Sequence, residues 1–539
     1  MKLCNTQNEL TTEYILPVKI IASVNAENVH ILLEEHPAQP FLGKAEVSVI
    51  KKNGYILFDF GEEFQGGADV VLQGDEKKRP HLRAVFGESV SEALSKIGEK
   101  NSGNDHSPRD IILEAPFLSH LYFGNTGFRF LKLEAVDEDL EITSLRGISR
   151  FRKLEYKGSF KCSDERLNKI WQVGAKTVHL NMQEYLWDGI KRDRLVWIGD
   201  MHPETSTISM VFGDTSVVRN SLDFIKDNTD IDSWMNGIPS YSMWWIKIHR
   251  DLYWENGDKE YLRNQLDYIV SVLKKTISSF KGDTSDIKSH FTEWSSANTK
   301  DEDAGFYAML ILGLEAGAEI IDILNGDKAL AAQARELSNV IKSKKVLIPE
   351  NKQIAAMLGL SGICDLNNMC EIIKSDGAKG LSTFWGYYVL NALWKNGDMN
   401  FALKLINTYW GTMLDFGATT FWEDFDIEWT KNAAPIDQIC PPGKDDIHGD
   451  FGKFCYTQFR HSLCHGWASG PTAFLSKKVL GIVPVEPGYK KITVSPCLDN
   501  LEFAEGTVPT PYGIIKVKHT NIGGKIKTEL SLPNGVEKI

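Results

Sequence analysis

Three aspartates, Asp188, Asp193 and Asp200, lie within the thirteen-residue stretch DGIKRDRLVWIGD. Their separations of five and seven residues match neither one face of a helix nor one face of a strand, so we expect an irregular loop that brings the carboxylates together. Loops of this kind often carry functional residues. Arg192 supplies a cation beside Asp193, and Trp197 supplies a flat apolar surface. The alternative is a salt-bridged loop between helices, with Trp197 in the core.

Three further segments place ionisable groups beside aromatic residues. In FWEDF, Glu423 lies between Trp422 and Asp424. His465 lies in HSLCHGW, and Trp294 follows a glutamate in FTEWSS. Each of these also has a structural interpretation, as a surface carboxylate or as a histidine satisfied in the core.

Paired carboxylates suit the hydrolysis of glycosidic bonds. An inverting enzyme needs one carboxylic acid and one carboxylate on opposite sides of the sugar, roughly 6.5–9.5 Å apart, so that a water molecule fits between them. Segments remote in sequence can supply such a pair, and tryptophan faces with further carboxylates can line the sugar pocket. The residues described above fit this chemistry.

The composition excludes several classes of function. With 72 acidic and 60 basic residues among 539, the net charge of −12 opposes binding to nucleic acid or anionic lipid. No run of about eighteen apolar residues predicts a membrane span, and no secretory signal is visible, so we expect a cytoplasmic protein, or an exported one whose leader has been removed. Motifs typical of nucleotide hydrolysis, dinucleotide binding, serine hydrolases and zinc proteases are absent.

We expect neither a metal nor a cofactor. The thirteen histidines have no ligand spacing, and the acidic run near Asp301 is more typical of a solvated helix start than of a metal site. The eight cysteines contain no CxxC pair, which predicts reduced, mostly buried thiols rather than disulfides or a zinc site.

The chain divides into three parts by its hydrophobic patterns. Short apolar runs, VHILLEE among them, and the turn signal Asn53-Gly54 predict an N-terminal β-sandwich over residues 1–155. Helical periodicity predicts a central all-α domain over residues 156–475. In residues 476–539, GIIKVKHT and GKIKTELSL alternate apolar and polar residues around the turn NIGG, which predicts a small C-terminal antiparallel β-domain.

The tripeptide Asn-Gly-Asp recurs three times in the central domain, beginning at Asn256, Asn325 and Asn396, with spacings of 69 and 71 residues. In each copy the glycine can take the left-handed conformation that ends one helix, and the aspartate can cap the next helix. Gly213-Asp214 is a weaker fourth copy. The pattern predicts helical hairpins laid side by side, as in a toroid or solenoid. The alternative is three unrelated loops that share a common turn tripeptide.

Four motifs, taken in chain order, resemble those of the α-L-rhamnosidases of glycoside hydrolase family 78: DGIKRDRLVWIGDMHPE, IPSYSMWWIKIHRDLYWENGD, GATTFWEDFD and SLCHGWASGPTAFL. DFGEEFQGGADV and FGESVSEAL look like the β-sandwich that precedes the catalytic domain in this family, and VLGIVPVEPGYKKITVSP looks like its C-terminal β-domain. The resemblance covers most of the chain. It implies a central (α/α)6 toroid and the inverting hydrolysis of terminal α-L-rhamnosides.

By position, the resemblance assigns the general acid to Asp193 and the general base to Glu423. It assigns sugar-binding or pocket-lining positions to eight further residues: Asp188, Arg192, Trp197, Asp200, Trp244, Trp245, Trp294 and His465. Many members of the family carry glutamate at the general-acid position, where this chain has the shorter Asp193.

The expected substrate is therefore a rhamnose-containing oligosaccharide or glycoside, and the oligomeric state is left open. Two alternatives remain. One is a related (α/α)6 glycosidase that acts on another sugar. The other is a carbohydrate-binding relative that has lost turnover, for which the exchange to Asp193 is the hint in the sequence.

Overall fold

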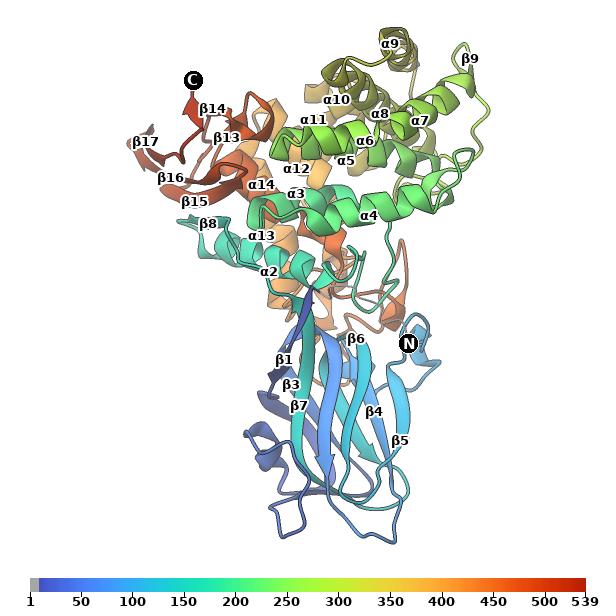
Figure 1. Cartoon of the computed structure of the whole chain (residues 1–539), viewed down its shortest axis with the longest axis vertical. Helices are drawn as coiled ribbons and strands as arrows, with labels where there is room; N and C mark the ends of the chain where they lie inside the picture. Colours follow the sequence, from blue (N-terminus) through green and yellow to red (C-terminus); the bar gives the residue numbers. More distant parts are fainter. Residues whose placement is uncertain (1–8) are drawn as a thin grey trace. The chain divides into compact units, whose positions relative to one another are not determined.

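The computed structural model describes residues 9–539 (Figure 1). These residues form two compact units, and each is made from three separate stretches of chain. The first unit contains the described residues up to Lys153, together with His179–Leu195 and Met413–His465. The second contains Leu154–Val178, Val196–Thr412 and Gly466–Ile539.

The first unit is built on one connected sheet of seven strands, in the order β1-β7-β3-β6-β4-β5 with β2 paired to β3. The strands are β1 (Leu10–Ile15), β2 (Lys19–Glu27), β3 (Ser48–Leu72), β4 (His81–Gly87), β5 (Asp110–Glu114), β6 (His120–Ala135) and β7 (Leu140–Arg152). A short helix, α1 (Val90–Leu94), follows β4.

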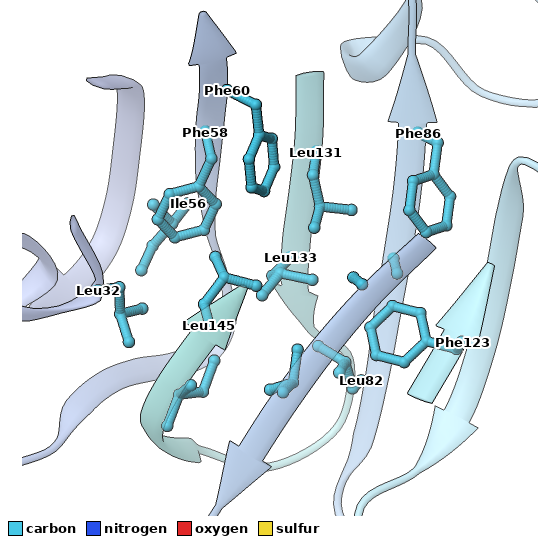
Figure 2. Packing of buried hydrophobic residues seen from close by; sticks show 14 of the residues in the cluster. Leu32, Ile56, Phe58, Phe60, Leu82, Phe86, Phe123, Leu131, Leu133 and Leu145 are labelled. Carbon is cyan, nitrogen blue, oxygen red and sulfur yellow. The ribbon is translucent and has the colours of Figure 1, made fainter. Parts of the chain in front are cut away.

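The core of this unit follows from the two-residue period of a strand. Ile56, Phe58 and Phe60 point to one face of β3 and pack with Leu131 and Leu133 of β6 (Figure 2). Leu57 points to the other face, where it packs in a second cluster with residues of α1. Because β3 buries both of its faces here, its residues 55–58 are consecutively apolar.

Two local predictions for this region are wrong. The run VHILL forms a 3-10 helix, Val29–Leu33, rather than a strand. Asn53-Gly54 does not reverse the chain: Asn53 has the left-handed φ of 59°, yet β3 continues through it. The pairs Val24↔Tyr55 and Ala26↔Ile50 leave β3 with a bulge opposite Asn25. A β-carbon at Gly54 would lie 2.6 Å from the carbonyl oxygen of Asn25. A glycine is therefore needed here because the backbones of the two strands approach each other closely in the bulge.

The second unit contains most of the helices. They are α2 (Glu165–Asn181), α3 (Met201–Val211), α4 (Ser216–Asp227), α5 (Pro239–Asn256), α6 (Lys259–Asn264), α7 (Leu266–Ser278), α8 (Glu302–Leu324), α9 (Lys328–Lys342), α10 (Lys352–Ser361), α11 (Leu366–Lys374), α12 (Gly386–Asn396), α13 (Met399–Asp415) and α14 (Gly470–Phe474), which continues as the π-helix η7 (Leu475–Val479). The last residues of α2 and α13 belong to the first unit.

The Asn-Gly-Asp tripeptides join consecutive helices, as predicted. Gly257, with φ of 70°, ends α5, and the Asp258 carboxylate accepts a hydrogen bond from a backbone N–H of α6. In the second copy Asn325 itself takes the left-handed conformation that ends α8, and Asp327 caps α9. In the third copy, Gly397 ends α12. The helix-ending role is therefore confirmed in all three copies, with asparagine in place of glycine in one, and the helix-capping role is confirmed in the first two.

The C-terminal strands form two small sheets. The first has the order β17-β16-β15-β8 and the second β13-β14-β18. Their bounds are β8 (Ser159–Cys162), β13 (Ile482–Pro484), β14 (Lys491–Val494), β15 (Phe503–Thr510), β16 (Gly513–Ile522), β17 (Lys525–Ser531) and β18 (Glu537–Lys538). The predicted hairpin of β16 and β17 is confirmed, with its turn at Gly523 and Gly524. The coarse prediction of an N-terminal sheet region, a helical middle and a C-terminal sheet domain is likewise confirmed, and its exact boundaries stay predictions.

The second unit also contains a cavity of about 400 Å³ that is open on one side. Its walls come from α3, α5, α8, α10, α12 and η7, with β13 and the segment around Tyr489 at one side. Each of these helices is separated from the next by at least one helix that does not line the cavity.

Within residues 9–539, none of the helices combines the length and apolar character that crossing a membrane requires. The seven cysteines in this part of the chain form no disulfide with one another, but only Cys162, Cys370 and Cys464 are buried, so the prediction of mostly buried thiols is wrong. Cys4 lies outside the described residues.

Candidate active site

Asp188 shapes the irregular loop that follows α2. Its carboxylate accepts a hydrogen bond from the backbone N–H of Asp193 at 2.6 Å and another from that of Leu195 at 3.0 Å. Its own backbone N–H donates to the carbonyl oxygen of Leu195 at 3.1 Å. The buried Asp188 thus ties together both ends of a tight turn, and this turn fixes the position of Asp193.

Asp193 projects from this turn toward two side chains from distant segments. The hydroxyl of Tyr456 donates to its Oδ1 at 3.1 Å, and Nε2 of His106 lies 3.2 Å from the same oxygen. The Asp193 side chain is 11% exposed. Solvent, or a substrate, can therefore still reach a carboxylate that is otherwise held in place.

Arg192 does not pair with its neighbour Asp193 but with the carboxylate of Asp105. Its guanidinium donates to both oxygens of Asp105, at 3.0 and 3.3 Å. Arg460 also reaches Asp105, at 2.6 Å. Although burial works in the opposite direction for both groups, this pairing raises the pKa of Arg192 and lowers the pKa of Asp105.

The ring of Tyr456 lies beside both of these guanidinium groups, 5.3 Å from Arg192 and 4.7 Å from Arg460. Burial raises the pKa of the Tyr456 hydroxyl, and the nearby charge of Asp193 raises it further. The hydroxyl therefore stays protonated and acts as a hydrogen-bond donor to Asp193 at ordinary pH.

Glu423 is held by the strand-like segment around Ser462. The backbone N–H of Glu423 donates to the carbonyl oxygen of Ser462 at 2.9 Å, and the N–H of Ser462 donates to Glu423 Oε2 at 2.8 Å. His465 lies further along the same segment, buried, with its backbone N–H bonded to the carbonyl oxygen of Phe421 at 2.9 Å. One oxygen of the Glu423 carboxylate is thereby oriented by the backbone.

Asp424, the next residue, is buried in a different setting. Its Oδ2 accepts backbone N–H bonds from Lys453 at 2.8 Å and Phe454 at 3.2 Å. Burial raises the pKa of Asp424 to about 6, against these hydrogen bonds, and the charge of Glu423 adds to the rise.

The charges of Asp193 and Glu423 act on the same neighbours. Both contribute to the raised pKa of Tyr456, and the charge of Glu423 also contributes to the raised pKa of Arg192. A hydrogen bond thus joins Tyr456 to Asp193, while Glu423 acts on Tyr456 only through its charge; that the two carboxylates share one site stays a prediction.

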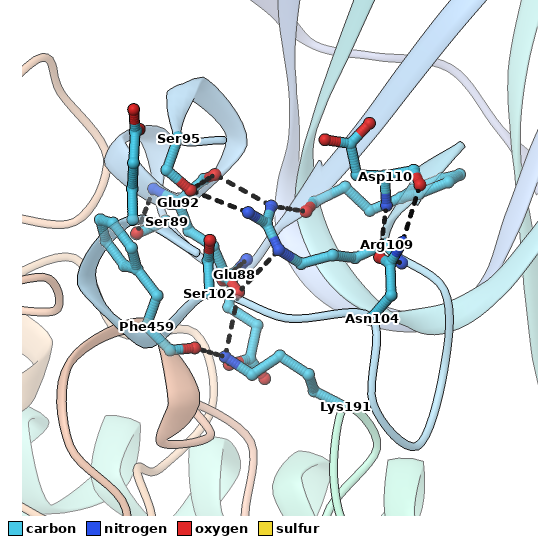
Figure 3. A network of polar contacts seen from close by, with 12 residues as sticks. Glu88, Ser89, Glu92, Ser95, Ser102, Asn104, Arg109, Asp110, Lys191 and Phe459 are labelled. Carbon is cyan, nitrogen blue, oxygen red and sulfur yellow. Dashed lines mark hydrogen bonds and ion pairs between the residues drawn. The ribbon is translucent and has the colours of Figure 1, made fainter. Parts of the chain in front are cut away.

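A second polar network lies close by in the same unit, at Glu88, Glu92 and Lys191 (Figure 3). The Lys191 ammonium lies 2.8 Å from Glu88 and 3.3 Å from Glu92, and it donates to the carbonyl oxygens of Phe459 and His461. All three ionic side chains are almost fully buried. Burial raises the pKa of Glu88, and the charge of Lys191 opposes this rise.

Glu88 and Glu92, with His448, also place potential metal-ligand atoms within 4.8 Å of one another. The imidazole is already engaged, with Nδ1 2.8 Å from the Ser89 hydroxyl and Nε2 3.1 Å from the carbonyl oxygen of His461. The ammonium of Lys191 supplies the positive charge that the two carboxylates need. This arrangement suits an internal ion pair better than a metal site.

Five of the predicted site residues belong to the second unit. Asp200 is buried directly before α3, and Trp197 is half-buried with its ring edge toward Tyr241. Trp244 lines the cavity of this unit, whereas the indole N–H of Trp245 donates to the carbonyl oxygen of Leu222 at 3.2 Å. Trp294 is 42% exposed.

Four residues of the cluster around Asp193 were not predicted from the sequence: Asp105, His106, Tyr456 and Arg460. The first two lie in the loop before β5 and the other two in the irregular segment after FWED. Neither segment has a periodic pattern that would have marked its side chains as part of a site.

Comparison with known proteins supports the motif assignment. Residues 155–357 match the bacterial alpha-L-rhamnosidase six-hairpin glycosidase domain, and residues 481–539 match the bacterial alpha-L-rhamnosidase C-terminal domain. The first motif lies within the matched range, and Glu423 lies outside both ranges.

Similarity to individual proteins extends over nearly the whole chain. An alpha-L-rhamnosidase of Alteromonas sp. (strain LOR) is 25% identical over 89% of this chain and 55% of its own length. The structure of the alpha-L-rhamnosidase from Dictyoglumus thermophilum has a TM-score of 0.75 at 17% identity, covering 99% of this chain and 59% of that one. A rhamnosidase from Klebsiella oxytoca, solved with rhamnose bound, has a TM-score of 0.70 at 18% identity, covering 87% and 96%.

This chain spans a little over half the length of the curated relatives that it matches. The predicted resemblance is confirmed by the matched domains and by the shared fold: the chain is similar to the α-L-rhamnosidases of glycoside hydrolase family 78 over nearly all of its length.

Proposed function

We propose that this chain is an inverting glycoside hydrolase that releases terminal α-L-rhamnose from rhamnosides. The proposal rests on one observation above all: Asp193 and Glu423, the two carboxylates at the positions of the family's acid and base, come from remote segments and influence the same Tyr456 hydroxyl. The names of the relatives indicate the sugar that is released, and the two carboxylates suit the hydrolysis of its glycosidic bond.

In this mechanism Asp193 is the general acid that protonates the departing glycosidic oxygen. The Tyr456 hydroxyl and the His106 imidazole both face Oδ1. Donors at this oxygen stabilise the carboxylate that is left after proton transfer. The hydrogen bonds of Asp188 hold the turn that carries the acid. The Asp193 side chain is therefore already positioned before the reaction, and no entropy is lost in ordering it.

Glu423 is the general base that takes a proton from the attacking water. The backbone N–H of Ser462 fixes one of its oxygens and so directs the carboxylate. Arg192 and His465, which lie in the same unit as both carboxylates, are the proposed contacts to the sugar. The methyl group of a 6-deoxy sugar would find its apolar surface on tryptophan, with a preference over a hydroxymethyl group of about 1–3 kcal/mol.

We further propose that the N-terminal sheet is a β-sandwich and that the central helices form an (α/α)6 toroid. Six helical segments that alternate with others along the chain, α3, α5, α8, α10, α12 and η7, line one cavity. This is the arrangement expected of the inner helices of a six-hairpin toroid.

The test is the hydrolysis of a nitrophenyl α-L-rhamnoside by the wild type, Asp193→Asn and Glu423→Gln. We expect free L-rhamnose from the wild type and a loss of roughly 10²–10⁴-fold in kcat for each variant, with unchanged circular dichroism. Activity that survives either substitution would remove the role proposed for that residue. A panel of other nitrophenyl glycosides checks the sugar, because faster turnover of a different glycoside would contradict the assignment to rhamnose.

A further inference from the structure

The cavity of the second unit has the size and lining of a ligand site. Its volume of about 400 Å³ lies in the range of small-molecule pockets. The partly exposed Trp254 gives it aromatic surface, with the buried stack of Trp244 and Tyr388 behind the wall, and the exposed Val483 lies on its lining, so the cavity opens to solvent. No residue of the Asp193 and Glu423 cluster belongs to it.

Cationic side chains outnumber anionic ones on the cavity wall. Four are cationic and two are anionic: Lys247, Arg250, Lys477 and Lys478 against Asp251 and Glu255. The remaining titratable groups on the wall are uncharged at neutral pH, because burial lowers the pKa of His202 to about 4 and raises that of Tyr388 and Tyr489.

Three of the four cations already have carboxylate partners. Lys247 and Arg250 both pair with Asp251, and Lys477 pairs with Glu255. Lys478 has none within ion-pair distance among residues 9–539; its ammonium lies over the ring of Trp394, 3.7 Å from the centroid. Lys478 is therefore the one cation of this wall that no carboxylate among residues 9–539 pairs with directly, although the charge of Asp251 acts on it from a greater distance.

A second group on the wall also lacks a partner. Trp244 is completely buried, and its indole N–H has no acceptor among the described residues. A buried donor left unsatisfied costs about 1–3 kcal/mol, and because the whole Trp244 side chain is covered, the wall would have to rearrange before a ligand could supply the acceptor.

We propose that this cavity binds a small anionic sugar, a monosaccharide that carries a carboxylate or a phosphate group. The anion pairs with Lys478, and the partly exposed Trp254 packs against the sugar ring. Burial and the charge of Lys477 lower the pKa of Lys478 to about 8, so a bound anion would also relieve this repulsion. The proposal does not depend on the reaction proposed above.

The experiment measures binding of glucuronate, glucose 6-phosphate and neutral glucose to the whole chain by calorimetry at pH 7. The variants are Lys478→Met, which keeps an apolar stem against Trp394, and Lys478→Arg, which restores the charge. Lys525→Met on β17 is the control, because Lys525 is exposed and far along the chain from the cavity residues. Thermal unfolding of each variant confirms that it is folded.

We expect the wild type and Lys525→Met to bind at least one of the two acidic sugars and not glucose. Lys478→Met should weaken binding at least about tenfold, the effect of losing a charge-assisted hydrogen bond, and Lys478→Arg should recover part of it. Tighter binding of glucuronate assigns the site to sugar carboxylates, and tighter binding of glucose 6-phosphate assigns it to sugar phosphates. No binding by the wild type at about 10 mM ligand, equal binding of glucose, or unchanged binding by folded Lys478→Met would overturn the proposal.

Discussion

Lys191 and Arg192 are neighbours in the chain, yet their side chains enter two polar networks of different character. Lys191 joins Glu88 and Glu92, where every charged group is almost fully buried (Figure 3). Arg192 joins Asp105, whose side chain is 34% exposed, beside the 11% exposed Asp193. One network is closed to solvent and the other is open on one side.

This difference distinguishes a network that stabilises the fold from one that can contact a substrate. A closed network whose members are mutually satisfied has no group left to meet a substrate, so its value is in fixing the chain. Ser462 shows how this works: its hydroxyl donates to Glu88 and its backbone N–H donates to Glu423. The closed network therefore holds the segment that orients the proposed base, while the open network presents the proposed acid.

The largest expected change in stability comes from opening the closed network with Lys191→Met. The substitution leaves Glu88, Glu92 and two carbonyl oxygens without their cation, which should lower the free energy of unfolding by roughly 3–5 kcal/mol. Urea denaturation at pH 7 measures it, with the exposed Lys44→Met as the matched control. A loss below about 1 kcal/mol would mean that the network adds little to the fold.

Asp424 sharpens the comparison, because it is a buried carboxylate whose side chain contacts backbone N–H groups rather than a cation. Its pKa is about 6 in the folded state against 3.8 for the free group, so the folded protein favours the protonated form. Asp424 therefore does not lower the free energy of unfolding below pH 4. As the pH rises through 6, the cost of ionising it in the folded state lowers the free energy of unfolding by up to about 3 kcal/mol.

Asp424→Asn removes this pH dependence while keeping an acceptor for the backbone. The free energy of unfolding of the variant minus that of the wild type should be about 2–3 kcal/mol higher at pH 8 than at pH 4. Urea denaturation at the two pH values measures this difference. The exposed Asp227→Asn serves as control and should show no such difference. An equal effect of Asp424→Asn at the two pH values would contradict the assigned pKa.

The smallest of these effects is expected in the open network, from Tyr456→Phe. The ring stays beside the guanidinium groups of Arg192 and Arg460, and only the hydrogen bond to Asp193 is lost. We expect kcat on a nitrophenyl rhamnoside to fall about tenfold, with a change in stability of about 1 kcal/mol or less. Tyr122→Phe, at an exposed ring, is the control; a variant as active as the wild type would show that this hydroxyl does not serve the acid.

Local signals in the sequence predicted the local structure well. The Asn-Gly-Asp tripeptides mark real helix ends, because a left-handed residue and a capping aspartate act within a few residues of chain. The same left-handed preference led to the wrong prediction of a chain reversal at Asn53, because the bulge there depends on Asn25 in another strand. A turn signal fixes the conformation of a residue, and its partner strand decides whether the chain reverses there.

The residues around the proposed acid and base could be predicted only in part, for the same reason. Asp188 and Asp193 could be recognised because they share one short stretch, and Glu423 by its aromatic neighbours. Tyr456 lies 263 residues from Asp193, and Asp105 lies 87 from Arg192. Contacts over such separations leave no periodicity or spacing in the sequence, so only the fold reveals them.

The division of labour between acid and base is tested most directly by changing the leaving group. Asp193→Asn and Glu423→Gln are compared on 2,4-dinitrophenyl α-L-rhamnoside, whose leaving group departs without protonation, and on phenyl α-L-rhamnoside, whose leaving group needs it. The proposed roles predict that Asp193→Asn keeps kcat within about tenfold of the wild type on the first substrate and loses roughly 10²–10⁴-fold on the second, whereas Glu423→Gln is impaired on both. An equal loss on the two substrates for Asp193→Asn, or full activity of Glu423→Gln on either, would contradict it.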